Sequence, residues 1–175
     1  MIETERLILR APIEADLEPF AAMSADPEVM RFLGPLMDRD AALALLDRVR
    51  NAIAEKGYGF WALERKADGA FLGLTGVQDY KPELPLYPGF ELGWRLSRTA
   101  WGQGYASEAA RAAMAFAFEQ LNASRVSAIT ATGNLQSQAV MRRIGMTARP
   151  DLDFDHPLLP ADSPLSQHVV FEILR

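Results

Sequence analysis

Apolar residues in the first part of the chain recur at the three- to four-residue spacing that is typical of amphipathic helices. One such stretch begins at Ile13, and a shorter one follows Asp26-Pro27. The clearest helix is predicted over 38–56, with Asp38 as its N-cap and Gly57 as its stop. Its buried stripe is expected to consist of Leu43, Leu46, Val49 and Ile53.

Strand-like runs of apolar and β-branched residues separate these helices from the rest of the chain. They cover 6–10, 59–64 and 71–77, and the Asp68-Gly69 pair between the last two is typical of a β-hairpin turn. Three prolines within 82–88 then predict a loop, which we interpret as a candidate substrate flap.

The second half of the chain alternates strands with helices. Strands are predicted over 90–96, 125–131 and 168–174, and helices over 106–120 and 135–144. An antiparallel meander followed by a strand-helix-strand crossover predicts a three-layer α/β (α+β) fold, with a mixed, mostly antiparallel sheet and one parallel crossover. A length of 175 residues, 49% of them hydrophobic, favours a single domain over 1–175.

The composition narrows the classes of function. Acidic residues outnumber basic ones by 23 to 18, so we expect no nucleic-acid partner. The chain has no cysteine, which excludes disulfides and a cysteine nucleophile. His156 and His168 lack the spacing and the third ligand of a zinc site, so we interpret both as making local hydrogen bonds and predict no metal. No apolar run approaches the roughly 18 residues of a membrane span, and we predict a cytoplasmic location.

A glycine loop between a predicted strand and a predicted helix is the strongest candidate for ligand binding. Gly102 and Gly104 leave room for phosphate oxygens at the helix N-terminus, where backbone N–H groups lack partners. No lysine follows as a Walker loop requires, and Ser107 stands where a dinucleotide fingerprint has glycine or alanine. The remaining interpretation is a pyrophosphate loop for coenzyme A.

Further motifs accompany this loop in a fixed order. They are TERLILR at 4–10, DPEVMRFL at 26–33, ELGWRL at 91–96, WGQGYASEA at 101–109, and Asn134 with Ser137 ahead of IGM at 144–146. As a set they resemble the GNAT superfamily of N-acetyltransferases, in the branch of the ribosomal-protein alanine N-acetyltransferases. Trp101 is usual in that branch, whereas Met141 stands where many members of the superfamily carry a tyrosine that acts as the thiolate acid.

The resemblance implies a GNAT-like fold and direct acetyl transfer from acetyl-CoA to a primary amine, without an acyl-enzyme. It implies that the cosubstrate is bound by Leu96, Ser97, Gly102, Gln103, Gly104, Tyr105, Ala106, Ser107, Asn134 and Ser137. Ser137 is also implied as a donor to the leaving thiolate, while Asn134 fits a helix N-cap equally well. Glu91 is our candidate base, acting through water, with a cross-strand ion pair as the alternative.

The acceptor amine is not identified by the sequence. Phe32, Trp61 and Tyr80 are candidates for lining its pocket, although each also fits the hydrophobic core. The loops 34–39, 80–89 and 150–166 are expected to select it. A protein N-terminus and a small molecule both stay open as acceptors, and a homodimer is one option for the assembly. The alternative functions are a CoA-binding module with little or no turnover and a nucleotide-binding oxidoreductase.

Overall fold

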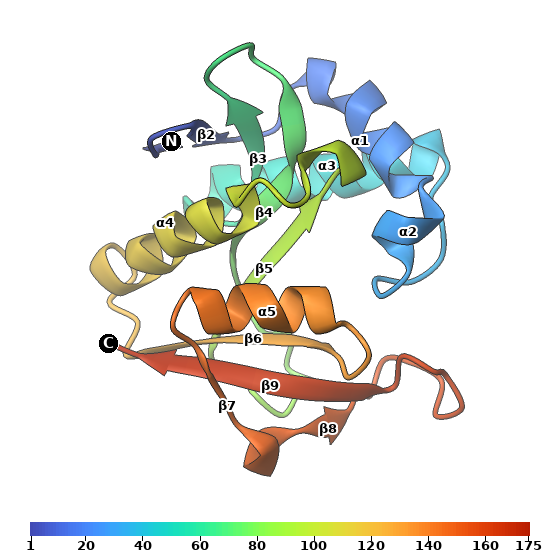
Figure 1. Ribbon diagram of the computed structural model, residues 1–175, viewed down its shortest axis with the longest axis vertical. Helices are drawn as coiled ribbons and strands as arrows, with labels where there is room; N and C mark the ends of the chain where they lie inside the picture. Colours follow the sequence, from blue (N-terminus) through green and yellow to red (C-terminus); the bar gives the residue numbers. More distant parts are fainter.

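The computed structural model describes residues 1–175, which form one nine-stranded mixed sheet with helices on both of its faces (Figure 1). The strands are β1 (Ile2–Glu3), β2 (Leu7–Arg10), β3 (Phe60–Arg65), β4 (Phe71–Asp79), β5 (Phe90–Leu96), β6 (Arg125–Ala131), β7 (Thr147–Ala148), β8 (Phe154–Asp155) and β9 (Gln167–Leu174). Their order across the sheet is β1-β2-β3-β4-β5-β6-β9-β7, with β8 paired to β9. The predicted mixed, mostly antiparallel sheet is therefore confirmed, and only the three two-residue strands were not predicted.

The helices of the first half are α1 (Leu17–Ser24), α2 (Pro27–Met30) and α3 (Arg39–Lys56). The Asp38 carboxylate accepts a hydrogen bond from the Ala41 N–H at 2.8 Å, and Gly57 ends α3 with a left-handed φ of 81°, so both predicted boundaries are confirmed. The predicted stripe was wrong at Leu43, which is 38% exposed. Ala42 takes its place, because positions 42, 46 and 49 lie on one face of the helix.

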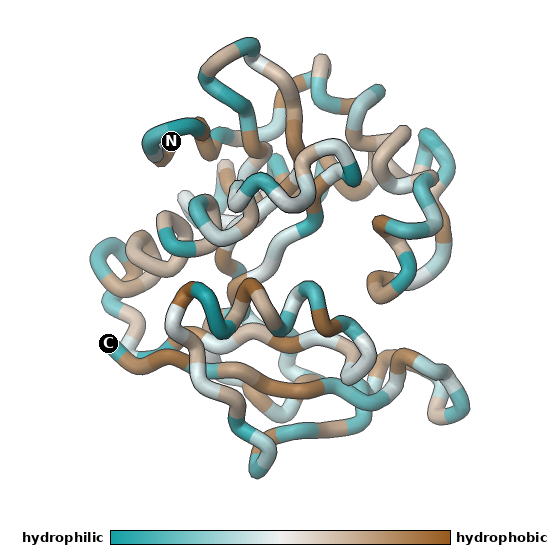
Figure 2. The backbone as a smooth tube through the Cα atoms, in the orientation of Figure 1, coloured by the Kyte–Doolittle hydropathy of each residue, from teal (hydrophilic) through white to brown (hydrophobic).

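Two hydrophobic clusters lie on opposite faces of the sheet. Leu74 and Ala62 point toward α1 and α3, whereas the neighbouring Leu63 and Trp61 point toward α4 (Tyr105–Glu119). β3 and β4 pair antiparallel as the Asp68-Gly69 turn predicts. In Figure 2 the tube is brown along much of β9, in keeping with the burial of Val170. No helix is both long enough and apolar enough to serve as a membrane span.

The parallel crossover is the feature that positions the site. β5 leads through α4 to β6, and the two strands pair only at Phe90 with Val126 and at Glu91 with Ser127. Beyond these pairs the strands diverge, as Figure 1 shows, and α5 (Leu135–Arg143) follows β6 on the other side of the opening. The carboxyl-terminal half of β5 therefore has no neighbouring strand on that side.

Candidate functional site

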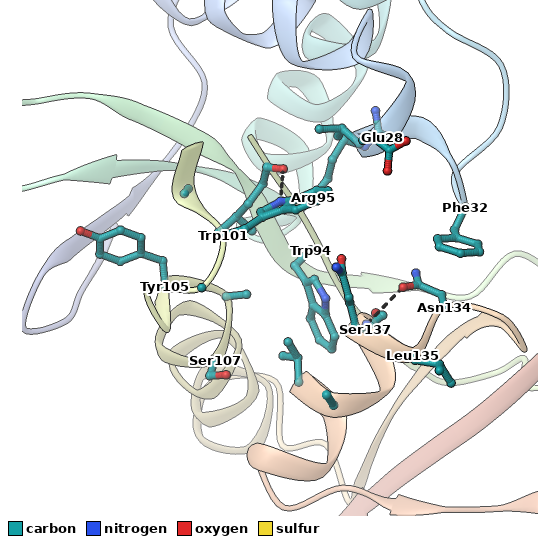
Figure 3. Close-up of a pocket in the computed structure, with 18 of the residues that line it drawn as sticks. Glu28, Phe32, Trp94, Arg95, Trp101, Tyr105, Ser107, Asn134, Leu135 and Ser137 are labelled. Carbon is teal, nitrogen blue, oxygen red and sulfur yellow. Dashed lines mark hydrogen bonds between the residues drawn. The ribbon is translucent and has the colours of Figure 1, made fainter. Parts of the chain in front are cut away.

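A cavity of about 860 Å³ lies where β5 and β6 diverge, a volume within the range of small-molecule sites. Its walls come from α2 and the residues after it, the end of β5, the glycine loop with the start of α4, and the start of α5. Figure 3 shows Phe32 and Asn134 on one side of it and Tyr105 and Ser107 on the other, with Trp94 between them. The predicted loop and the predicted Asn134 and Ser137 motif thus meet in one cavity.

The glycine loop presents unpaired backbone donors to this cavity. Gly102 and Gly104 have φ values of 74° and 81°, a region that residues other than glycine rarely adopt. Gly104 is the N-cap of α4 but has no side chain to cap it, so the first N–H groups of the helix stay free. The backbone N–H groups of 103–107 donate to no acceptor in the chain. These donors and the positive end of the helix dipole form a site for an anion.

Neighbouring side chains hold the loop in this conformation. The Trp101 Nε1–H donates to the Leu96 carbonyl oxygen at 2.9 Å, and the Arg6 guanidinium donates to the Gln103 carbonyl oxygen at 3.0 Å. Glu108, in the first turn of α4, accepts hydrogen bonds from the Thr4 hydroxyl and from Arg6. Burial works against ionisation of Glu108, but these hydrogen bonds outweigh it and hold its pKa below the usual value. Glu108 therefore anchors the N-terminal segment as well as complementing the helix dipole.

The exposed edge of β5 provides a second set of backbone groups. The Ser97 N–H donates to the Leu72 carbonyl oxygen on the β4 side at 2.9 Å. Because antiparallel pairs alternate, the N–H and C=O groups of Leu96 and Trp94 point the other way, toward the opening. Leu96 lines the cavity as predicted, whereas Ser97 does not, and its N–H is already used within the sheet. Trp94, which was not predicted from the sequence, lines the cavity instead.

Asn134 and Ser137 line the cavity from α5. The Asn134 side-chain oxygen accepts a hydrogen bond from the Ser137 N–H at 3.2 Å, and its amide group donates to the Thr130 hydroxyl at 2.9 Å. Asn134 is therefore an N-cap, the alternative that the sequence left open. The Ser137 hydroxyl makes no hydrogen bond within the chain, so it is free to donate into the cavity. Met141 is buried in the core and lies outside the cavity.

Of the three side chains predicted to line the acceptor pocket, one lines the cavity and two do not. Phe32 lines the cavity and lies close to Gly133, where an added Cβ would be 3.5 Å from the ring. Trp61 and Tyr80 do not line it. Trp61 packs edge-on against Phe116 in the core, and the buried Tyr80 hydroxyl accepts a hydrogen bond from Ser127 at 3.2 Å. Both belong to the hydrophobic interior, so their expected place at the acceptor pocket is not observed.

Glu91 lies at the closed end of the opening, where β5 still pairs with β6, and it does not line the cavity. Its carboxylate accepts a hydrogen bond from the Gln78 side-chain amide at 2.9 Å, on the neighbouring strand. No ion pair forms, which was the alternative. Burial raises the pKa of Glu91, and the hydrogen bond from Gln78 only partly offsets this effect. Its role as a base stays a prediction.

The loops expected to select the acceptor do not line the cavity. None of 34–39, 80–89 or 150–166 contributes to its walls, and the segment that does is 28–33, in α2 and just after it. The proline-rich loop joins β4 to β5 at the closed end of the opening, because β5 begins there and runs toward the cavity. The two histidines each make the local hydrogen bond predicted for them.

Arg143 adds positive charge beside the glycine loop. Its guanidinium donates to the Ser107 hydroxyl at 3.3 Å and forms no salt bridge with any carboxylate. It lines the main cavity and also an adjoining surface hollow next to Arg111. A charge-assisted hydrogen bond from such an arginine favours phosphate groups. Arg143 could not be identified from the sequence, because an arginine in the last turn of a helix is common for its favourable interaction with the helix dipole alone.

Comparisons with known proteins agree with this geometry. A family model described as an acetyltransferase (GNAT) domain matches residues 6–147. YkkB of Bacillus subtilis (strain 168) is 34% identical over 146 residues, which cover 82% of this chain and 83% of YkkB. The FsC-acetyl coenzyme A-N(2)-transacetylase of Aspergillus fumigatus is 36% identical over 132 residues, 71% of this chain but 55% of that protein, so the match spans about half of it. The crystal structure of an acetyltransferase from Agrobacterium tumefaciens has a TM-score of 0.79 at 29% identity, covering 99% of this chain and 94% of that one.

Proposed function

The chain belongs to the GNAT acetyltransferase family and is an acetyl-CoA-dependent acyltransferase, and from this premise we propose that it acetylates a primary amine by direct transfer. The family match confirms the resemblance to the GNAT superfamily drawn from the motifs. The proposed acceptor class is a small-molecule amine or a peptide N-terminus.

One observation carries the proposal: the free N–H groups of 103–107 lie in the same cavity as the unpaired edge of β5. The first set suits a pyrophosphate, because the helix dipole and the backbone donors act on the same anion. The second suits the amide groups of a pantetheine arm, which can pair with the backbone groups of Trp94 and with the Leu96 N–H, whereas the Leu96 carbonyl oxygen already accepts the Trp101 Nε1–H. Arg143 supplies a further cation next to the phosphates. The residues present therefore fit acetyl-CoA.

The chemistry requires a neutral amine, a donor for the carbonyl oxygen and a proton for the leaving thiolate. The amine nitrogen forms a bond to the acetyl carbon, the carbon–sulfur bond breaks, and the amine loses a proton while the thiolate gains one. In this proposal, a backbone N–H at the β5 edge donates to the carbonyl oxygen. The Ser137 hydroxyl is the free donor for the thiolate. An α-amine with a pKa of about 8 is already partly neutral near pH 7.5.

A module that binds CoA with little or no turnover is the second candidate. The only carboxylate that lines the cavity belongs to the exposed Glu28, so the cavity has no buried base. The buried Met141 stands where many family members carry the tyrosine that acts as the thiolate acid. Both features favour binding without turnover. In that case the cavity would bind CoA tightly without any transfer to an acceptor.

The test is the release of free CoA thiol from acetyl-CoA with a panel of amines, together with CoA binding by calorimetry. Transfer to at least one amine supports the enzyme, and tight CoA binding with no transfer to any amine supports the module. Ser137→Ala should lower kcat about 100-fold, in the range for loss of a proton donor, and leave the Kd for CoA within about twofold. Ser124→Ala is the matched control, because Ser124 is exposed and lies outside the cavity. A Ser137→Ala variant with wild-type kcat would exclude Ser137 as the donor.

A further inference from the structure

Arg95 is a partly buried charge that the proposed transfer does not use. Its guanidinium makes no hydrogen bond and no salt bridge within the chain, and its Nη1 atom is buried without a partner. The group lies 6.0 Å from the centre of the Phe20 ring, at the outer limit of a cation–π contact. Buried polar side chains in folded proteins normally have a hydrogen-bond partner, so a guanidinium that faces a cavity without a partner in the chain is available to bind an anion there.

Arg95 faces the side of the sheet away from the glycine loop. In the pairing of β4 with β5 it is opposite Leu74, which belongs to the cluster around α1 and α3. Trp94 and Leu96, its neighbours along the strand, face α4. The free N–H groups of α4 and Arg143 are therefore on the other face from Arg95. The phosphates of CoA are proposed to bind to those groups, so Arg95 is available to bind the acceptor.

The side chains around Arg95 indicate which kind of chemical group it would bind. Val29 and Phe32, from α2 and the segment after it, line the same cavity as Arg95. Glu28 also lines the cavity, but it is exposed and lies outside salt-bridge distance of Arg95. Its Oε2 atom is 4.0 Å from the Nη1 atom of Arg31. Burial lowers the pKa of Arg95, and no carboxylate acts on it in the opposite direction. An arginine nevertheless stays protonated in proteins, so the charge persists and favours an anion.

We propose that the acceptor amine carries a carboxylate and that Arg95 binds this carboxylate through its guanidinium fork. The inference rests on the proposed function and adds to it the chemical class of the acceptor. A planar guanidinium matches a carboxylate with two parallel hydrogen bonds, which also orients the amine. The apolar side chains beside it suit the hydrocarbon part of the same molecule. A polyamine, by contrast, would bring positive charge to a positive site.

The experiment compares acceptors that differ only at the carboxylate. Leucine, leucinamide and 3-methylbutylamine form one series, and tripeptides beginning with aspartate or asparagine form another, so a free amino acid and an acidic peptide are distinguished. Wild type should prefer the carboxylate member of at least one series by about 10-fold or more in kcat/KM, as charge-assisted hydrogen bonds typically give. In Arg95→Met this ratio should fall to about 1, and Arg95→Lys should retain part of it.

Two controls separate recognition from a structural role. Arg48→Met removes an exposed arginine that lies outside the cavity, and it should leave the ratio unchanged. Thermal unfolding of Arg95→Met without ligands should give a Tm equal to or above that of wild type, because the substitution removes an uncompensated, partly buried charge. An equal loss of activity toward every acceptor, or a clear fall in Tm, would show that Arg95 serves the fold instead.

A binding measurement keeps the inference testable if no acceptor is turned over. In the presence of CoA, leucine or the aspartate peptide should raise the Tm of wild type but not of Arg95→Met. That result without turnover would refute the proposed transfer and support the carboxylate site. Turnover of amines with no preference for carboxylates in wild type would refute the carboxylate site and support the transfer. The absence of both turnover and a Tm shift would overturn both.

Discussion

Gly104 and Gly57 form a matched pair for testing how the phosphate site is built. Each borders a helix with a φ of 81°, Gly104 as the N-cap of α4 and Gly57 as the C-cap of α3. An alanine would not clash at either position: the nearest atom to an added Cβ at Gly104 is Arg6 Nη2 at 3.5 Å, and nothing lies within 4 Å at Gly57. Replacement by alanine therefore tests only the left-handed backbone, which costs a residue other than glycine about 1–2 kcal/mol.

The cost of the left-handed backbone should lower the stability of Gly57→Ala, whereas in Gly104→Ala it should weaken the binding of CoA. The Gly57 N–H donates to the Ile53 carbonyl oxygen at 2.8 Å, so Gly57→Ala cannot relax without losing this bond. We expect it to lower the free energy of unfolding by about 1–2 kcal/mol and the Tm by about 2–8 °C, without changing the Kd for CoA. Gly104 is exposed and its N–H has no partner, so the loop of Gly104→Ala can relax until CoA binds, at the cost of the exposed hydrogen bond from Arg6 to the Gln103 carbonyl oxygen. Binding must then restore the strained geometry, and the Kd should rise about 5- to 30-fold.

Calorimetric titration with CoA and urea unfolding of both free variants provide the two quantities. An unchanged Kd for Gly104→Ala, alongside the expected loss of stability in Gly57→Ala, would refute the view that the left-handed loop positions the phosphate donors. A Gly57→Ala variant as stable as wild type would instead refute the energy assigned to the backbone.

Three further substitutions test the neighbouring groups. Arg143→Gln should raise the Kd for CoA about 10- to 100-fold at low salt, because a charge-assisted hydrogen bond to phosphate is lost, and titration at higher salt should show a smaller difference. Asn134→Ala should lower the free energy of unfolding in urea by about 1 kcal/mol, because the N-cap of α5 is lost. Glu91→Gln removes a carboxylate whose pKa is raised by burial. A raised pKa contributes stability that is present below about pH 4.5 and is lost as the pH rises through the folded-state pKa, so the variant should be at least as stable as wild type at pH 7 in urea unfolding.

Each of these expectations has an outcome that contradicts it. A Kd for CoA in Arg143→Gln that equals the Kd in Arg48→Gln, the control at an exposed arginine, would contradict the first expectation. For Asn134→Ala the contradicting outcome is unchanged stability with weaker CoA binding, which would make the residue a ligand rather than a cap. Glu91→Gln also decides the base: a fall of about 100-fold or more in kcat/KM supports the role, and wild-type activity excludes it.

The local signals in the sequence predicted most elements because each depends on residues close together in the chain. Asp38 and Gly57 mark the ends of α3 through hydrogen bonds and a backbone angle that involve only neighbouring residues. The bounds predicted for β5 and β6 agree with the structure.

The opening between β5 and β6 could not be predicted in the same way. Whether two strands stay paired beyond Glu91 and Ser127 depends on the packing of α4 and α5 on the sheet, and no run of residues encodes it. Without the opening, Tyr80 and Trp61 were as plausible at a pocket as Phe32. Arg95 gave no signal either, because an arginine that alternates with apolar residues on a strand normally faces water.

The opening also explains how residues from opposite faces of a strand can serve one reaction. In a paired strand, the side chains of Trp94 and Arg95 would be separated by the sheet itself. Where β5 has no neighbouring strand on one side, Trp94 and Arg95 line the same cavity. Trp94 lies with the groups that suit CoA, and Arg95 lies with the groups proposed for the acceptor. The acetyl carbon and the amine must approach to about 3 Å, and the free edge of β5 is where ligands bound on both faces can meet. In this proposal, the divergence of two parallel strands brings the two substrates together while the sheet keeps their charged ends apart.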